Sequence, residues 1–216
     1  MNILITAASE NELLIAKQVC NNIPHQVTCV ATGIGIAATT YHTVKQFQHG
    51  DYDLAINIGI AGSFCERFPI GSVVVVNKEY FGDIGIQTQS GFDTLFDQQL
   101  MEDNTFPFVN GALHCAPLSP EVTAALEIFP RAVGVTVHTT SGQVVRIEEL
   151  RSRFTPDIET MEGAAFFYVC LHEKVPFVEM RSVSNKVAPR DKNTWDIPEV
   201  LGNLKTELKS FLQNIA

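Results

Sequence analysis

Short apolar runs alternate along the chain with longer segments in which apolar residues recur every three or four positions. The run at residues 2–8, NILITAA, is followed at 10–20 by ENELLIAKQVC, and the same alternation returns at 25–32, 33–47 and 54–62. Apolar, β-branched runs favour strands, whereas a spacing of three to four residues is typical of an amphipathic helix. The first 62 residues therefore predict the order strand, helix, strand, helix, strand.

The alternation becomes irregular in the centre of the chain and returns in its last third. The segment 87–110 is polar with scattered phenylalanines, and we expect a loop or a lid there. Strands and helices that alternate in this way build a layered α/β fold. We therefore predict a three-layer α/β/α sandwich around a central mixed, twisted sheet. Its remaining strands are expected at 72–88, 132–140 and 175–183, and its remaining helices at 159–173 and 197–214.

The composition is that of a chain with a well-buried core. Of the 216 residues, 45% are apolar and 18% are charged, and no run of Pro, Gly or Ser resembles a linker. A chain of this length can build one good-sized core, so we expect a single domain spanning residues 1–216. With 15 Lys and Arg against 24 Asp and Glu, the formal net charge is −9. This balance disfavours nucleic acid and anionic membranes as partners.

The cysteines and histidines show none of the spacings typical of metal sites. The five cysteines include no C-x-x-C pair, and the six histidines stand apart from one another. Scattered cysteines in odd number favour free thiols in a reducing compartment, and no metal is expected. Glu10 and Glu12 occur too early for a signal peptide, and no apolar run is long enough to span a membrane. The sequence thus predicts a cytoplasmic protein.

A glycine pattern after the second predicted strand partly resembles a dinucleotide-binding turn. In TGIGIAAT, Gly33 and Gly35 are followed by Ala38 where a third glycine would fall, and Asp53 lies twenty residues after Gly33. A ribose-binding acid would end the next strand, whereas Asp53 precedes the apolar run at 54–62. A tight strand-to-helix turn is therefore the preferred interpretation, and nicotinamide binding is the alternative. No cofactor is expected.

Six short motifs occur in the order, and at nearly the separations, found in one family of enzymes. The chain resembles the nucleoside phosphorylases and nucleosidases, in particular the bacterial methylthioadenosine/adenosylhomocysteine nucleosidases, across most of its length. The phrases YFGDIGIQTQSGF and SNKVAPRDKNTWDI resemble the futalosine hydrolase branch, whose members remove hypoxanthine from futalosine. The resemblance implies a homo-oligomeric enzyme that cleaves the N-glycosidic bond of a purine nucleoside. The motifs are AASENE, TGIG, NIGIAG, SGQ, ETMEGAAFFYVC and PFVEMRSVSN.

The resemblance assigns Glu12 to the attacking water and Glu162 to the ribose. Departure of a purine makes the ribosyl carbon oxocarbenium-like while water attacks the opposite face. Glu12 can orient that water and accept its proton, although without the motif a solvated helix face would be the ordinary interpretation. Met161 and Glu162 match the pair that holds the ribose hydroxyls, and an acid in the first turn of a helix is the alternative for Glu162. Arg181 is expected to organise nearby carboxylates or to form a surface ion pair.

Ser184 and Asn185 fall where the adenine-directed nucleosidases carry Ser-Asp, and the acid is absent here. An amide cannot protonate a purine, but its NH2 can donate to a 6-oxo group or N7 while its carbonyl accepts from a ring N–H. Asn185 is therefore expected to act on a 6-oxopurine such as hypoxanthine, with a turn Asn as the alternative. Gly62 and Val145 are also placed in the substrate pocket. Because Val145 replaces a base-stacking Phe of the adenine-directed enzymes, another residue is expected to stack on the base.

Hydrolysis is favoured over phosphorolysis by the residues near the glycine turns. TGIGIAATT and NIGIAGSF contain no Arg for a phosphate, and Ile60 stands where related phosphorylases often carry a phosphate-contacting Ser. Glu12 would also repel an anion at the water site. Arg146, Lys186 and Arg190 are candidates for binding an anionic 5′ substituent. The alternatives are a methylthioadenosine- or aminofutalosine-type nucleosidase, a nucleoside phosphorylase, and a nucleoside-binding module without catalysis.

Overall fold

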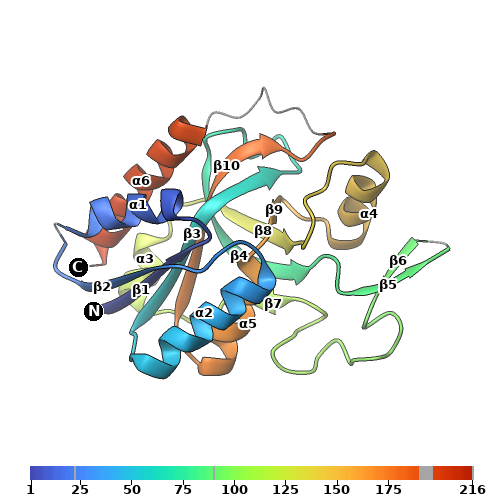
Figure 1. Cartoon of the computed structure of the whole chain (residues 1–216), viewed down its shortest axis with the longest axis horizontal. Coiled ribbons are helices and arrows are strands. Elements are labelled where there is room, and N and C mark those ends of the chain that lie inside the picture. Colours follow the sequence, from blue (N-terminus) through green and yellow to red (C-terminus); the bar gives the residue numbers. More distant parts are fainter. Residues whose placement is uncertain (22, 90, 190–196, 216) are drawn as a thin grey trace.

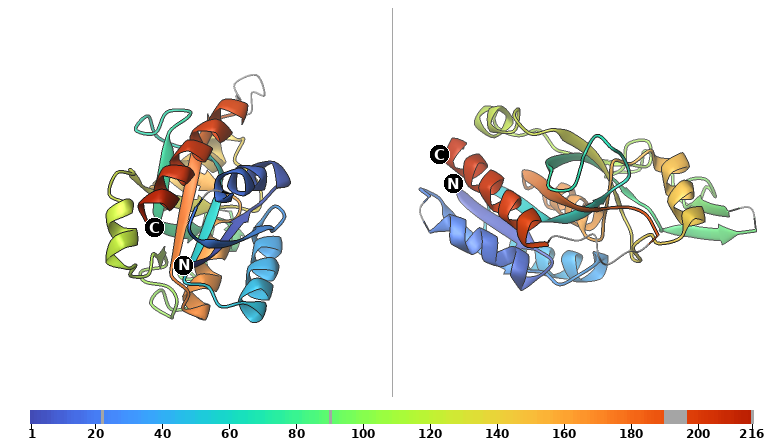
Figure 2. Two further views of the ribbon diagram at one scale, coloured as in Figure 1. Left: turned by 90° about the vertical axis from the view of Figure 1, so that its left-hand side faces the viewer. Right: turned by 90° about the horizontal axis from the view of Figure 1, so that it is seen from above.

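Helices cover both faces of a central sheet in the computed structural model of the chain (Figure 1). Helices α1 (Glu10–Cys20) and α6 (Ile197–Asn214) pack on each other over one face, and α2 (Ile36–His49) and α5 (Gly163–Glu173) pack on each other over the opposite face. Two further views show the same helices from the side and from above (Figure 2). The predicted three-layer α/β/α fold is confirmed. The structure describes residues 1–21, 23–89, 91–189 and 197–215.

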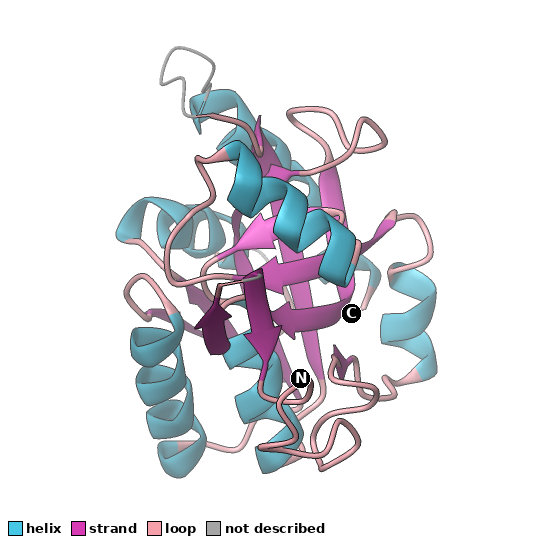
Figure 3. Ribbon diagram, turned by 90° about the vertical axis from the view of Figure 1, so that its right-hand side faces the viewer, coloured by secondary structure: helices cyan, strands magenta, loops and turns pink. Residues whose placement is uncertain are grey.

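The sheet is mixed and closes on itself. Strand β10 pairs parallel with β3 and antiparallel with β4, and a path from β4 through β8 and β9 leads back to β3. Strands β1 and β2 continue the sheet from β3. Helices surround the strands of the molecule (Figure 3). The strands of this sheet are β1 (Asn2–Ala7), β2 (Gln26–Ala31), β3 (Leu54–Ser63), β4 (Val73–Phe81), β7 (Leu113–His114), β8 (Arg131–Thr136), β9 (Ile158–Thr160) and β10 (Phe177–Lys186).

Apolar side chains on both faces of the strands explain why two helical layers cover them. Ile3 and Ile5 of β1 belong to the core that includes α1 and α6, whereas Leu4 belongs to the core that includes α5. Parallel strands covered on both faces have nearly continuous apolar sequences, as here. On α6, Leu204 and Leu208 are fully buried and lie one turn apart on the same face. Burial of each side chain contributes about 1.5–3 kcal/mol.

The predicted strand at 72–88 is divided in the structure. Strand β4 ends at Phe81, and β5 (Gly85–Thr88) pairs with β6 (Gly91–Thr94) instead of the main sheet. Gly82 N still donates to Thr136 O of β8, and beyond it the Asp83 carboxylate accepts from the backbone N of His138 at 2.6 Å before the chain enters β5. The predicted loop from residue 87 therefore begins with a β-hairpin.

The predicted helix at 159–173 begins four residues later than expected. Glu159 and Thr160 belong to β9, which pairs with β3 and β8, and α5 begins at Gly163. Pairing with strands distant in sequence overrides the local helical pattern. Glu162 was expected in the first turn of a helix. It is the N-cap of α5 and so immediately precedes that turn.

Two helices lie in segments to which the sequence pattern assigned none. Helix α3 (Pro120–Ala125) begins after Ser119, whose hydroxyl accepts from Val122 N at 3.3 Å. Helix α4 (Val144–Phe154) buries an apolar stripe at Ile147, Leu150 and Phe154. Both helices had a sequence signal, namely a Ser-Pro start for α3 and a three- to four-residue apolar spacing for α4.

Gly33 and Gly35 form a tight turn between β2 and α2, as the preferred interpretation predicted. Their φ angles are 86° and 91°, values that favour glycine, and Gly35 is the N-cap of α2. The Asp53 carboxylate accepts from the backbone N of Asn2 at 2.7 Å. Asp53 therefore lies at the amino end of β3, at the opposite end of that strand from a ribose-binding position.

Candidate active site

Three parallel strands bring most of the predicted site residues to one edge of the sheet. Strands β1, β3 and β10 run parallel, so their carboxyl ends lie on the same side. Glu12 is in the first turn of α1, which follows β1, while Gly62 lies near the end of β3 and Arg181 and Asn185 lie near the end of β10. Ligands bind at this edge, beyond the carboxyl ends of parallel strands, in both open and closed α/β sheets.

Glu12 is held in place at the start of α1 rather than lying on a solvated helix face. Its Oε2 accepts from Ser9 N at 2.9 Å and from Ser9 Oγ at 2.7 Å, and its Oε1 accepts from Ile60 N at 3.2 Å. The side chain is 8% exposed. Ser9 also caps the helix by accepting from Glu12 N. Ser9 was not among the predicted site residues, although the spacing S-x-x-E is a capping-box signal.

The Glu12 carboxylate and the Arg181 guanidinium approach the same glycine. A Cβ atom at Gly59 would lie 3.0 Å from Oε1 of Glu12 and 2.7 Å from Nη1 of Arg181. A side chain at this position would displace one of the two groups. Gly59 was not among the predicted site residues, because its role depends on contacts between elements distant in sequence.

Arg181 is buried, so the surface ion pair considered for it is wrong. The residue is 1% exposed, its Nε pairs with Oε1 of Glu179 at 2.9 Å, and its Nη2 donates to Oδ1 of Asn57. Neither partner was predicted. Two fixed partners hold the guanidinium plane, and the remaining Nη1 is the nitrogen near Gly59.

Glu162 joins the start of α5 to the glycine turn before α2. Its Oε1 accepts from Gly35 N at 2.9 Å, and the residue is 8% exposed. Burial raises the pKa of the Glu162 carboxyl, while Arg181 opposes that rise. Met161, which precedes Glu162, is partly exposed beside it. The structure thus places Glu162 within the electrostatic influence of Arg181 and Glu12.

Asn185 lies within β10 and not in a turn. Strand β10 extends to Lys186, three residues beyond its predicted end, and an irregularity between Val183 and Asn185 sets Asn185 opposite Gly62 of β3. Oδ1 of Asn185 accepts from Ser184 Oγ at 2.8 Å, and Nδ2 donates to Lys186 O at 2.9 Å. Such a bulge redirects a side chain at the end of a strand.

The positions of Gly59 and Gly62 show where Glu12 and Asn185 approach β3. A Cβ atom at Gly62 would lie 3.2 Å from Nδ2 of Asn185, so Asn185 is next to Gly62 as Glu12 is next to Gly59. The two glycines are three residues apart on β3, which corresponds to about 10 Å along a strand. Glu12 and Asn185 therefore approach β3 at two separate points near its carboxyl end.

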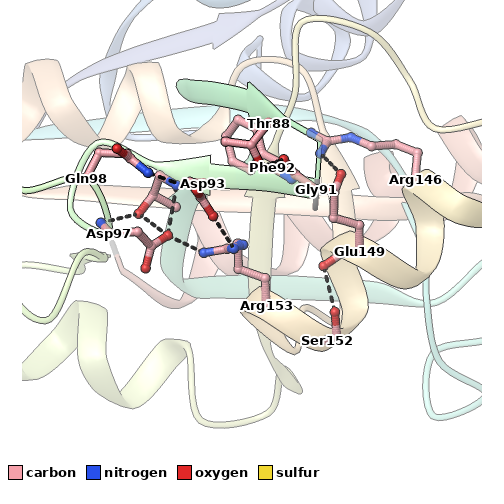
Figure 4. Close-up of polar contacts among 11 residues, drawn as sticks. Thr88, Gly91, Phe92, Asp93, Asp97, Gln98, Arg146, Glu149, Ser152 and Arg153 are labelled. Atoms are coloured by element: carbon pink, nitrogen blue, oxygen red, sulfur yellow. Dashed lines mark hydrogen bonds and ion pairs between the residues drawn. The ribbon is translucent and has the colours of Figure 1, made fainter.

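Val145 lies in the first turn of α4 and is 81% exposed. The next residue, Arg146, pairs with Glu149 at 2.7 Å and donates to Gly82 O at 2.7 Å. Oε1 of Glu149 accepts from Phe92 N of β6 at 2.6 Å, so Arg146 and Glu149 fasten the β5–β6 hairpin to α4 (Figure 4). This engagement makes Arg146 a weaker candidate for binding a 5′ substituent.

Of the other two candidates for the 5′ substituent, Lys186 lies within the described residues. Lys186 is exposed and pairs with the exposed Glu66 at 2.6 Å. Arg190 lies outside the described residues. Exposed pairs of this kind contribute little stability, so the Lys186 ammonium can exchange Glu66 for another anion at low cost.

Other parts of the described structure offer less for catalysis. A surface hollow lined by Met1, Asp53, Leu54 and Pro176 lies at the amino ends of β1 and β3, at the opposite edge from Glu12. Across residues 1–21, 23–89, 91–189 and 197–215, no group of three or more His, Cys, Asp or Glu side chains is arranged to hold a metal ion. Within the same ranges, no helix combines the length and the apolarity needed to cross a membrane.

Similarity to known proteins extends over nearly the whole chain. A futalosine hydrolase of Streptomyces coelicolor is 31% identical over 192 residues, covering 85% of this chain and 77% of the relative. A 5′-methylthioadenosine/S-adenosylhomocysteine nucleosidase of Pseudoalteromonas translucida is 27% identical, covering 86% of this chain and 84% of that protein. The structure of the corresponding nucleosidase of S. pneumoniae with the transition-state inhibitor MT-ImmA matches the fold with a TM-score of 0.82, at 20% identity and full coverage of both chains.

The family assignment rests on the extent of the match as well as on identity. The family model of the phosphorylase superfamily matches residues 16–215. This range contains Gly59, Glu162, Arg181 and Asn185, and it begins four residues after Glu12. The chain therefore belongs to the phosphorylase superfamily.

Proposed function

We propose that this chain is a nucleosidase that hydrolyses futalosine, a 5′-substituted 6-oxopurine nucleoside, to hypoxanthine and dehypoxanthine futalosine in menaquinone biosynthesis. The observation that carries the proposal is the arrangement along β3, where Glu12 lies at Gly59 and Asn185 lies at Gly62. The Glu12 carboxylate activates the attacking water, and the Asn185 amide binds the purine base. The 31% identity to the futalosine hydrolase of Streptomyces coelicolor supports this substrate.

At the water end, Glu12 orients the nucleophile and takes its proton. Oε2 already accepts two hydrogen bonds from Ser9, whereas Oε1 accepts one from Ile60 N and keeps a free lone pair. Water held there attacks C1′ as the glycosidic bond breaks and positive charge develops on the sugar. A positioned general base of this kind contributes about 10²–10⁴-fold to the rate.

At the sugar, Glu162 binds the ribose hydroxyls with Met161 beside it. A hydrogen bond from the 2′-hydroxyl to a carboxylate strengthens as the oxocarbenium-like state forms. Arg181 stabilises the ionised form of Glu162, whose pKa is raised by burial. The guanidinium thus keeps Glu162 able to accept a hydrogen bond from the substrate.

At the base, Asn185 supplies a donor and an acceptor to the 6-oxopurine edge. The amide NH2 donates to O6 or N7 of hypoxanthine, and the carbonyl accepts from a ring N–H. In the free protein these groups bond to Lys186 O and Ser184 Oγ, so binding of the base replaces local hydrogen bonds. An ionised Asp at this position would accept only and would oppose a 6-oxo oxygen.

Water is preferred over phosphate as the second substrate. The buried Arg181 is already paired with Glu179 and Asn57, and Glu12 would repel an anion beside Ile60. Neither glycine turn carries an Arg. We therefore expect free sugar as the product, and not a sugar phosphate.

An adenine-directed nucleosidase is the second candidate, because the Pseudoalteromonas translucida relative carries that name at 27% identity. Asn185 distinguishes the two candidates, since an amide does not protonate a departing adenine. A nucleoside-binding module without catalysis is the third, and the fixed Glu12 carboxylate opposes it. The homo-oligomeric state remains a prediction.

Chromatography of released base tests the proposal. The protein is incubated separately with futalosine, aminofutalosine and methylthioadenosine, each with and without phosphate. We expect hypoxanthine from futalosine at a rate that phosphate does not change. Faster release of adenine from the other two substrates would favour the second candidate, phosphate-dependent turnover would indicate a phosphorylase, and no base from any substrate would favour the binding module.

A further inference from the structure

Two carboxylates lie buried below the site, and the mechanism above uses neither of them directly. Glu79 on β4 and Glu179 on β10 are both 0% exposed. A Cβ atom at Gly163 would overlap with Oε1 of Glu79 and would lie 2.6 Å from Oε1 of Glu179. Because Gly163 has no side chain, the two carboxylates come together at the start of α5.

One oxygen of each carboxylate has a defined partner. Oε2 of Glu79 accepts from Thr136 Oγ1 at 2.9 Å, and this oxygen of Thr136 accepts from Ala164 N at 2.7 Å. Oε1 of Glu179 forms the ion pair with Arg181. Among the described residues, Oε1 of Glu179 has this ion pair but no hydrogen bond, and the buried Oε1 of Glu79 and Oε2 of Glu179 have neither. Two ionised carboxylates would leave both of these oxygens unsatisfied beside a like charge.

The surrounding charges favour uptake of a proton by the pair. Burial, followed by the charge of Glu179, raises the pKa of Glu79 well above its ordinary value. Burial also raises the pKa of Glu179 to about 7, although Arg181 opposes this rise. A single guanidinium faces several carboxylates here. The charged or titratable neighbours are Glu162 at the start of α5, Arg181 on β10, Cys115 after β7 and, beside Cys115, Arg131 on β8.

We propose that Glu79 and Glu179 share one proton, and that the remaining single negative charge holds the Arg181 guanidinium in the site. Glu179 is thus a positioning residue for Arg181. The geometry places the proton on Oε1 of Glu79, from which it is donated to Glu179, because Oε2 of Glu79 already accepts from Thr136. This bond satisfies both otherwise unpartnered oxygens. The positioning role rests on the proposed nucleosidase function, whereas the shared proton is a property of the folded chain.

Infrared spectroscopy of the substrate-free protein tests the shared proton. At mildly alkaline pH we expect a C=O stretching band from a buried protonated carboxyl group in the wild type, and loss of that band in Glu79→Gln. The control Glu66→Gln changes an exposed carboxylate and should leave the band unaltered. A wild-type spectrum without such a band, or a Glu79→Gln spectrum identical to that of the wild type, overturns the shared proton.

Kinetics of base release test the positioning role. Glu79→Gln keeps an acceptor for Thr136 and a donor toward Glu179, so kcat should stay close to that of the wild type. Glu179→Gln removes the charge beside Arg181, and kcat should fall about 10- to 100-fold with a smaller change in KM, the scale expected when a positioned group shifts by about 1 Å. Equal losses in both variants, or no loss in Glu179→Gln, contradict this role. If the wild type releases no base, the proposed function fails while the infrared result still decides the shared proton.

Discussion

Ser9 and Glu12 bind each other reciprocally: the Ser9 hydroxyl accepts from Glu12 N, and the Ser9 backbone N and hydroxyl both donate to the Glu12 carboxylate. The interaction that starts α1 therefore also fixes the proposed general base. Helix capping and the proposed catalysis share the same two residues, so a change to either should be visible in both stability and activity.

Glu12→Gln should keep the fold and lose most turnover of futalosine. Gln keeps the shape of the side chain and an acceptor for Ile60 N but cannot take a proton from water, so we expect kcat to fall about 10²–10⁴-fold. Steady-state kinetics measure this loss, and Glu10→Gln is the matched control because Glu10 is exposed and pairs only with Lys17 among the described contacts. Retention of near-wild-type kcat would remove Glu12 from the mechanism.

Ser9→Ala should lower both stability and kcat. Loss of an N-cap side chain costs about 0.5–2 kcal/mol of unfolding free energy, and the Glu12 carboxylate loses one of its two hydrogen bonds from Ser9. Denaturant unfolding measures the first effect and base release the second. Ser119→Ala, which removes the cap of α3, is the control: it should reduce stability without lowering kcat. A kcat unchanged in Ser9→Ala would show that Ser9 acts only as a cap.

Gly59→Ala should impair activity more than stability. The added Cβ would lie 2.7 Å from Nη1 of Arg181 and 3.0 Å from Oε1 of Glu12, so at least one of these groups must move. We expect a fall of at least about tenfold in kcat/KM, in line with the sensitivity of catalysis to small displacements. Gly202→Ala on α6 is the control, since a Cβ there meets nothing within 4 Å. Equal activity in the two variants would contradict the close approach at Gly59.

Asn185→Asp should weaken release of hypoxanthine relative to adenine. An ionised carboxylate offers no donor to a 6-oxo oxygen, a loss of about 1–3 kcal/mol, which corresponds to about 5- to 150-fold in kcat/KM. The measurement is the ratio of kcat/KM for futalosine and aminofutalosine in the wild type and the variant. Lower pH should partly restore futalosine turnover, because a protonated Asp can donate. An unchanged ratio would show that Asn185 does not read the 6-position of the purine.

The stability of the wild type should decrease as the pH rises from the ordinary carboxylate range through about 7. The pKa values of Glu79 and Glu179 are raised in the folded chain, the latter to about 7, so the folded state keeps a proton that the unfolded chain has released. Glu79→Gln removes one of these carboxylates and should flatten this decline. Urea unfolding at several pH values measures it, and parallel curves for the wild type and Glu79→Gln would contradict the raised pKa of Glu79.

Local patterns in the sequence were sufficient for several elements of the fold. The strand at 54–62 and the terminal helix at 197–214 occur as predicted, because their apolar spacing matches the burial that the sheet and α6 require. The turn at Gly33 and Gly35 was also predicted, since its positive φ angles are a local requirement. Glu12, Glu162 and Arg181 were selected by their motifs, and the structure places all three near one another.

The remaining elements and the geometry of the site depend on contacts between distant segments. No local sequence pattern encodes these contacts. Glu159 and Thr160 have helical spacing but form β9, because β3 and β8 offer them backbone partners. Gly59 and Gly163 look like ordinary glycines, yet Glu12 on α1, Glu79 on β4, and Glu179 and Arg181 on β10 reach them from three other elements. Closure of the sheet between β10, β3 and β4 buries Glu179 beside Arg181. Burial and close approach are properties of the assembled strands, and they convert these scattered residues into one electrostatic network.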